Sequence, residues 1–251
     1  MPIWTGSSAV VRRFSMTIAA GLVLACLTVL AGATPAAAPD SGRDPLSSNL
    51  DLLSSAQPSV AFPTVTDVAT DVVSASQART TKVDAAATTS ATCDGCVGTP
   101  QTLQAVYLRH ADTVKADNSA IAWSQQCTGC SANAVSIQII VAPAASTLVA
   151  NNRALALNLQ CEGCSTTAAA YQIVLADSDQ TLSTSARDEL RSLMSSLRRE
   201  LADERQGGQQ DNAAAQEKRL ASTGLSRIER IVTVDLGTTV VAKRAAVDLG
   251  R

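Results

Sequence analysis

Bulky apolar side chains alternate with small or amide side chains along much of the middle of the chain. Between residues 154 and 160, for example, Leu155, Leu157 and Leu159 alternate with Ala, Asn and Gln. The side chains of a β-strand point alternately to its two faces, so this two-residue period predicts strands with one bulky and one small-residue face. The pattern occupies residues 120–126, 134–141, 154–160 and 166–175.

A Cys-x-Gly-Cys segment separates the strands of each predicted pair and recurs every 34 residues. The three segments are Cys93 to Cys96, Cys127 to Cys130 and Cys161 to Cys164. A short turn with glycine between two strands is typical of a β-hairpin. We therefore expect three 34-residue hairpin units over residues 84–178, in one antiparallel sheet. Pro100 interrupts the first unit, as is common in a terminal, capping repeat.

The period changes after the third unit. Leu190, Leu193, Leu197 and Leu201 form an apolar stripe at helical spacing, behind a capping Ser183 or Thr184. We expect a helical hairpin over residues 179–237, broken at Gly207 and Gly208, that covers the bulky face of the sheet. A strand or tail follows in residues 238–251, so the predicted fold class is α+β.

The N-terminal part resembles a targeting segment. Arg12 and Arg13 precede an apolar stretch that ends at Leu30, and Ala31-Gly32-Ala33 suits cleavage by a signal peptidase. We expect residues 1–33 to be a signal peptide. An uncleaved membrane anchor and lipidation at Cys26 are the alternatives. Residues 34–83, rich in Ala, Ser, Thr and Pro, are expected to be a disordered linker.

Composition argues against several functions. The net charge is −2, the pI is about 5.4, and no run of Lys or Arg stands beside aromatic side chains. Nucleic acid is therefore not an expected partner. One histidine, His110, and the lack of hydrolase, phosphate-loop or dinucleotide motifs favour a non-catalytic role, and no cofactor is expected.

Three kinds of chemistry compete for the cysteine pairs. A disulfide across each turn fits the short separation of turn ends and the oxidising environment of an exported protein. Alternatively, two turns supply four thiolates to one zinc ion, which leaves the third pair without a partner. A thiol-redox role would need a nearby cation or helix N-terminus that these turns lack. The disulfide interpretation is favoured, and no bound metal is expected.

The small-residue face is the candidate contact surface, because a sheet face without bulk allows close approach of a second sheet. Self-association or an envelope protein partner would use it, whereas membrane contact is expected only through the N-terminal segment. Gln104, Gln138 and Gln172 hold the same position in each unit, which favours a ladder of side-chain hydrogen bonds over a role in lining a ligand face. The candidate contact residues are Ala120, Ala122, Gln138, Ala154, Ala156 and Gln172.

Several short motifs recur together: Asn-x-Ala-x-Ala, Cys-x-Gly-Cys, Ala-x-x-x-Gln-Ile-Val, and a Leu-Ser-x-x-Ala helix start at Leu182 to Ala186. In these the chain resembles, over about residues 84–236, a group of exported actinobacterial cysteine-repeat proteins, some labelled peptide zinc metalloprotease. The resemblance implies an exported cysteine-repeat protein. It carries over no protease activity, because the residues that would ligate a catalytic zinc are missing.

These observations together predict a non-catalytic structural or interaction module of the cell envelope or extracellular space, with hairpin turns locked by disulfides. A zinc-binding or thiol-redox protein that uses the Cys-x-Gly-Cys pairs is the alternative.

Overall fold

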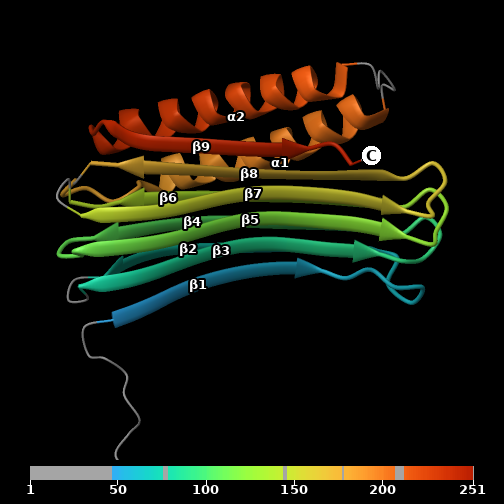
Figure 1. Cartoon of the computed structure of the whole chain (residues 1–251), viewed down its shortest axis with the longest axis horizontal. Coiled ribbons are helices and arrows are strands. Elements are labelled where there is room, and N and C mark those ends of the chain that lie inside the picture. The colour runs from blue at the N-terminus through green and yellow to red at the C-terminus, as the bar shows by residue number, and fades with distance from the viewer. Residues whose placement is uncertain (1–46, 76–78, 144–145, 177, 207–211, 251) are drawn as a thin grey trace, which may run out of the picture. The chain divides into compact units, whose positions relative to one another are not determined.

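The strands of the repeat form two sheets that face each other in a β-solenoid (Figure 1). The computed structural model describes residues 47–75, 79–143, 146–176, 178–206 and 212–250. All of them lie in the unit Arg43–Arg251. Sheet A contains β1 (Ser47–Ala56), β3 (Thr80–Ala91), β5 (Thr113–Gln125) and β7 (Thr147–Leu159). Sheet B contains β2 (Thr64–Ala75), β4 (Val97–Leu108), β6 (Ser131–Val141), β8 (Ser165–Leu175) and β9 (Val240–Asp248).

Each repeat unit is one coil of the solenoid, and equivalent residues of successive coils lie side by side. A strand of sheet A leads through a corner into a strand of sheet B, and the chain then returns to sheet A one level further along. The pairing is parallel, so that Ala120 lies beside Ala154 and Gln138 beside Gln172. This stacking explains why the sequence repeats itself at fixed spacing.

The antiparallel hairpins expected from the sequence are not what the structure contains. The two strands that flank a Cys-x-Gly-Cys segment belong to different sheets, and each pairs in parallel with its equivalent in the next coil. A two-residue period predicts a strand but does not specify its partner. The mixed α+β character is confirmed, whereas the strand pairing is corrected. The one antiparallel pair among the described strands joins β8 and β9.

The first coil lies within residues 34–83, where a disordered linker was expected. Strands β1 and β2 form it, and β3 also begins there, at Thr80. This coil has no cysteines, and its Ala, Ser and Thr side chains gave no sustained apolar period. Its strands form because the next coil offers each of them a sheet edge to pair with: β1 pairs with β3, and β2 pairs with β4. The signal peptide expected at residues 1–33, with Cys26, lies outside the described residues.

Two kinds of core hold the fold together. The small-residue faces of both sheets pack against each other in the interior, where Ala120, Ala134 and Ala168 are buried. The bulky face of sheet B, with Ile137, Tyr171 and others, lies under the two C-terminal helices. These helices are α1 (Thr184–Gln206) and α2 (Ala213–Leu236), close to the helical hairpin expected at 179–237.

The C-terminal edge of the solenoid is covered by the end of the chain. Strand β9 pairs with β8, and the Asp248 carboxylate accepts a hydrogen bond from Ala156 N of β7 at 2.9 Å. These contacts use backbone groups of the last coil that would otherwise be free to pair with another chain. Among the described residues, no helix has the length and hydrophobicity needed to span a membrane.

Candidate functional site

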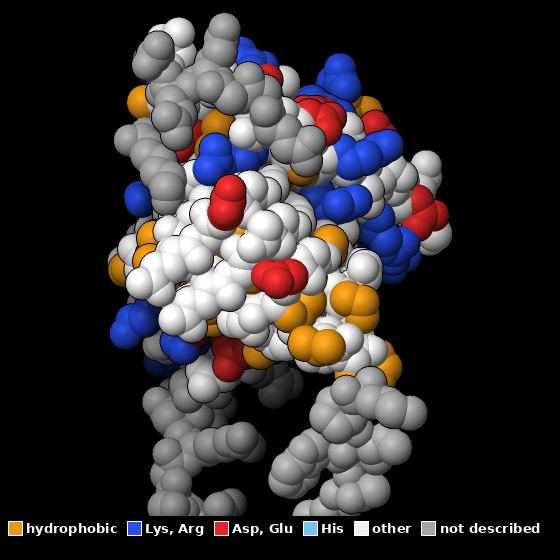
Figure 2. All heavy atoms as spheres, turned by 90° about the vertical axis from the view of Figure 1, so that its right-hand side faces the viewer, with side chains coloured by type: hydrophobic (Ala, Val, Ile, Leu, Met, Phe, Trp, Pro, Cys, Tyr) orange, Lys and Arg blue, Asp and Glu red, His pale blue; other side chains and the backbone are white. Residues whose placement is uncertain are grey.

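Each Cys-x-Gly-Cys segment forms the corner where the chain leaves sheet A for sheet B. The three corners stack at the end of the solenoid that faces the viewer in Figure 2, where most of the surface is neutral. Gly129 and Gly163 have φ of 64°, in the left-handed region that side chains other than glycine rarely adopt. An added Cβ would meet no atom within 4 Å at either position. The glycine is therefore required by the backbone conformation and not by lack of space.

The two cysteines of each corner lie close together, as in a disulfide. Their Cα atoms are 5.3 Å apart in the first corner, 6.2 Å in the second and 5.9 Å in the third, within the range that a disulfide needs. In each pair the two Sγ atoms are within bonding distance. The close cysteine pairs expected from the spacing are thus present in all three corners.

Sulfur atoms of neighbouring corners also converge. The Sγ atoms of Cys127, Cys130, Cys161 and Cys164 all lie within 4.8 Å of one another. Cys127 Sγ is 3.5 Å from Cys161 Sγ and 4.0 Å from Cys164 Sγ. Among the described residues, no other group of His, Cys, Asp or Glu side chains brings its metal-ligating atoms this close together. The spacing of the cysteines predicts three equivalent pairs, but only the structure shows that the sulfur atoms of the second and third pairs form one compact group.

The surroundings of the sulfur atoms are apolar and contain no cation from the corners. Cys127 and Cys130 are buried among alanines, and Cys161 and Cys164 are half-buried at the edge of the same cluster. None of the three corner segments contains Lys, Arg or His, and the first and third carry a carboxylate instead. A cation is what stabilises the thiolate of a redox-active cysteine, so the structure adds no support to a thioredoxin-like role.

The face expected to contact a partner lies inside the solenoid. Ala120, Ala122 and Gln138 are fully buried, Ala156 is 2% and Gln172 is 1% exposed, and the neighbouring Ala154 packs against the same cluster. Small side chains do permit a second sheet to approach closely, but that second sheet is the other layer of the same chain. This surface is therefore not available to a partner.

The repeated glutamines form the hydrogen-bonded ladder that their fixed position in each unit favoured over a ligand-lining role. Gln138 Nε2 donates to Gln104 Oε1 at 2.9 Å, and Gln172 Nε2 donates to Gln138 Oε1 at 2.7 Å. Gln138 Nε2 also lies 3.0 Å from the Val83 carbonyl oxygen of the opposite sheet. The ladder is thus confirmed, and it joins three coils and both sheets through buried amides.

The outer face of sheet A is the surface that sequence reasoning missed. Leu155, Leu157 and Leu159 of β7 are 43%, 40% and 46% exposed, beside the half-buried Ile121 and Trp123 of β5. We call these five residues the open face. The same alternation that predicts the strand also identifies the bulky side chains. We expected helices to cover them, but α1 and α2 cover only sheet B.

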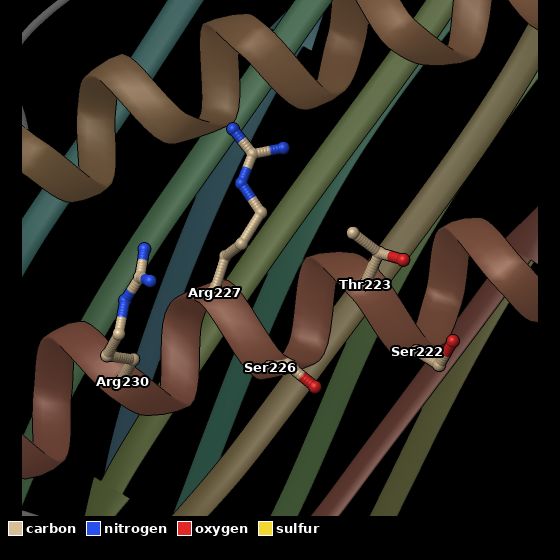
Figure 3. Close-up of a pocket in the computed structure, with 5 residues that line it drawn as sticks. All are labelled: Ser222, Thr223, Ser226, Arg227 and Arg230. Carbon is tan, nitrogen blue, oxygen red and sulfur yellow. The ribbon is translucent and has the colours of Figure 1, made fainter.

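Polar side chains also line a shallow depression along α2 (Figure 3). Figure 3 shows Arg227 extending from α2 toward α1. Its guanidinium donates to Glu200 Oε1 at 2.7 Å and to Ser196 Oγ at 3.3 Å. Partial burial opposes ionisation of Glu200, but the hydrogen bonds from Arg227 and Ser196 outweigh it and lower the pKa of this carboxyl. These side chains join the two helices, and their arginine is already paired.

Comparison of the chain with protein-family models, curated proteins and solved structures finds no match. The function must therefore be argued from the solenoid, its cysteine corners and its open face.

Proposed function

We propose that this chain is a non-catalytic, exported β-solenoid that acts as a structural or interaction module of the cell envelope or extracellular space. The observation that carries the proposal is the unequal covering of the two sheets. Helices cover the bulky face of sheet B, while the bulky side chains of sheet A remain at the surface. Exposed apolar side chains in one contiguous patch commonly mark a site of protein association.

The open face suits a flat protein partner better than a small ligand. Its three leucines stand at alternate positions of one strand and form a flat apolar strip. Charged pairs lie on the same outer surface of sheet A, beside the open face. In one of them, Arg153 Nη2 is 2.9 Å from Asp117 Oδ1. An apolar centre beside a polar, charged region is a common arrangement in protein interfaces. The proposed partner is a protein of the envelope or a second copy of the chain.

Disulfides within the corners are part of the proposal. Closing a loop of only four residues stabilises the fold by about 2 kcal/mol in the chain-entropy estimate. Their main contribution is to hold each corner, and with it the register of the coil. Intact mass of the exported protein, alkylated with and without prior reduction, tests this. We expect six cysteines to become alkylated only after reduction. Alkylation without reduction would refute the disulfides.

The open face is tested by replacing two of its leucines. We expect Leu155→Ser with Leu159→Ser to reduce association of the processed protein with the envelope fraction, or its self-association in sedimentation velocity. Val234→Ser is the control, because Val234 is an apolar side chain on α2, outside the open face, and is 78% exposed. If the double variant and the control distribute and sediment as the original chain does, the open face has no such role.

Export itself is tested by sequencing the N-terminus of the protein recovered outside the cytoplasm. We expect cleavage after Ala33. A lipid on Cys26 or an intact N-terminus would instead support the lipoprotein or anchor alternative.

A further inference from the structure

The second and third corners are held against each other by backbone hydrogen bonds. Gly129 N donates to the Glu162 carbonyl oxygen at 2.8 Å, and Glu162 N donates to the Cys127 carbonyl oxygen at 3.3 Å. Ser165 N donates to the Cys130 carbonyl oxygen at 2.9 Å. The two corners are thus fixed in one parallel register, and their four cysteine side chains are directed into the same small volume.

This volume has the dimensions of a tetrathiolate site. Zinc bound by four cysteines has Zn–S distances of about 2.3 Å in a tetrahedron, so that neighbouring sulfur atoms are separated by about 3.8 Å. The separations between corners, 3.5 Å and 4.0 Å from Cys127 Sγ, lie on either side of that value. Within each corner, rotation of the reduced side chains allows the two sulfur atoms to separate. Two residues between paired cysteines is the usual spacing in such sites.

Cys93 and Cys96 of the first corner lie outside the compact sulfur group. The first corner nevertheless stacks on the second, where Gly95 N donates to the Thr128 carbonyl oxygen at 2.9 Å and Ser131 N to the Cys96 carbonyl oxygen at 2.8 Å. Gln126 and Gln160, which precede Cys127 and Cys161, have φ of 50° and 52°. The equivalent residue of the first corner is Thr92, which is not among the described residues with positive φ. A β-branched side chain strongly disfavours the left-handed region. The backbone that enters the first corner therefore differs at this one residue, whereas Gly95 inside the corner keeps the left-handed φ of 67°.

We propose that, in the reduced chain, Cys127, Cys130, Cys161 and Cys164 bind one Zn²⁺ ion as four thiolates, and that Cys93 and Cys96 take no part. This arrangement removes the difficulty that three equivalent pairs leave one without a partner. Four soft thiolates in tetrahedral arrangement select Zn²⁺ over hard cations such as Mg²⁺ or Ca²⁺. The site goes beyond the proposed interaction role and does not depend on it.

The chemistry of the site is a proton exchange without electron transfer. Each thiol loses its proton, so four protons leave as one Zn²⁺ binds. Oxidation of the same four thiols to two disulfides instead removes four electrons and four protons. The metal-bound and disulfide states are therefore mutually exclusive at these sulfur atoms. The reduced chain holds the metal, and the oxidised chain holds the cross-links.

Cobalt titration of the full chain tests the site. The protein is reduced with a water-soluble phosphine, which becomes the phosphine oxide as it reduces each disulfide, and is then titrated with Co²⁺ without oxygen. We expect one equivalent to produce the intense sulfur-to-cobalt and visible bands of a tetrahedral thiolate site, and Zn²⁺ to abolish them. Absence of these bands in the reduced, folded chain would overturn the proposal.

Two double variants show which cysteines bind. Cys127→Ser with Cys161→Ser is expected to weaken Co²⁺ binding at least about 100-fold, because one ligand is lost from each corner. Cys93→Ser with Cys96→Ser is the matched control and is expected to keep one equivalent with unchanged bands. Loss of binding in a folded control, or full binding in the first variant, would refute the assignment. Circular dichroism of both variants verifies that the sheets are formed.

The dependence on pH gives a further readout. Protons compete with the metal for thiolates, so apparent affinity is expected to rise with pH and to fall at least about tenfold between pH 8 and pH 6. Binding that does not change over this range would contradict thiolate ligation. Leu155→Ser with Leu159→Ser should leave the titration unchanged, which separates this proposal from that on the open face.

Discussion

At the scale of single residues, two tyrosines of the core under the helices differ in whether their hydroxyl groups have a hydrogen-bond partner. Tyr107 Oη accepts a hydrogen bond from Leu182 N at 2.8 Å. Tyr171 is fully buried, and its hydroxyl has no partner in the described part of the chain. Burial raises the pKa of Tyr171 far above its ordinary value. Burial also raises the pKa of Tyr107, although the backbone donor at Leu182 opposes this.

This difference predicts opposite effects of the same substitution. Tyr171→Phe is expected to leave the free energy of unfolding unchanged or to raise it by about 1 kcal/mol, because a buried hydroxyl without a hydrogen bond is destabilising. Tyr107→Phe is expected to lower it by about 1–2 kcal/mol, since Leu182 N loses its acceptor. Urea denaturation of both variants measures the two changes. Equal losses in both would contradict the assignment of the hydroxyl groups.

Gly224 is a second position where a single atom affects the stability of the core. It lies on α2 directly over Tyr171, and an added Cβ would be 2.6 Å from Tyr171 Oη and 2.7 Å from Cζ. Tyr171 cannot move away easily, because it is one of the largest fully buried side chains. The glycine therefore allows the helix to pack closely on the sheet.

Gly224→Ala is a test in which two effects have opposite sign. Helix propensity alone would stabilise the alanine variant by about 1 kcal/mol. Overpacking against a buried ring costs about 1–3 kcal/mol, so we expect a net loss of stability in thermal unfolding. Ser226→Ala, on an exposed position of the same helix, is the control and should be neutral or slightly stabilising. A stabilised Gly224→Ala variant would show that the helix does not pack as closely as described.

At the scale of elements, the glutamine ladder ties successive coils together. Gln138 is its central member and bonds to a glutamine on either side, whereas Gln172 is the last member and its Oε1 has no described partner. Buried amides that satisfy one another fix the register between coils, and leaving them unpaired is costly.

Gln138→Leu is therefore expected to be strongly destabilising. It would leave Gln104 Oε1 and Gln172 Nε2 without their partners in the interior, at a cost of about 2–4 kcal/mol. Gln172→Leu, at the end of the ladder, should cost less because it removes one ladder bond. Urea denaturation measures the loss of unfolding free energy in both variants. If Gln138→Leu loses no more than Gln172→Leu, the ladder does not hold the coils in register.

The elements themselves could largely be predicted from the sequence, but their pairing could not. Alternation at Leu155, Leu157 and Leu159 identified β7, and the leucine stripe that begins at Leu190 identified α1. Both patterns depend only on the local period of one strand or helix. The parallel pairing of Ala120 with Ala154 involves residues 34 positions apart. A repeat fits either side-by-side hairpins or stacked coils, and the local period does not distinguish them.

At the scale of the whole unit formed by residues 43–251, the two helices act as a cover for one sheet only. Leu190, Met194, Leu197 and Ile228 pack on the bulky face of sheet B. Without them, the apolar side chains of β4, β6 and β8 would be exposed in one continuous surface, and the edge of β8 would lose its partner β9.

A chain that ends at Ser178 is therefore expected to aggregate. We expect it to sediment as large assemblies or to be insoluble, while the full chain sediments as a discrete species. Light scattering of the two proteins at the same concentration, measured after purification under identical conditions, makes the comparison. A soluble, monomeric and folded truncated protein would show that the helices are dispensable as a cover.

Features that depend on local period and fixed spacing could be predicted from the amino-acid sequence alone. These are the strands from 120 to 175, the two helices, a turn with glycine between successive strands, and the close pairing of the cysteines within each turn. Each follows from the geometry of a few neighbouring residues. The proposal of export also rests on the sequence alone, on residues 1–33.

Which surfaces are buried depends on how the two sheets and the helices pack together. The small-residue face of Ala120 and Gln138 became the interior because two sheets of one chain close upon it, and β1 became ordered because β3 offers it an edge. The convergence of Cys127 with Cys161 and the exposure of Leu157 also depend on how coils stack and on which sheet the helices cover. Burial is a property of the assembled layers, and no local pattern contains it.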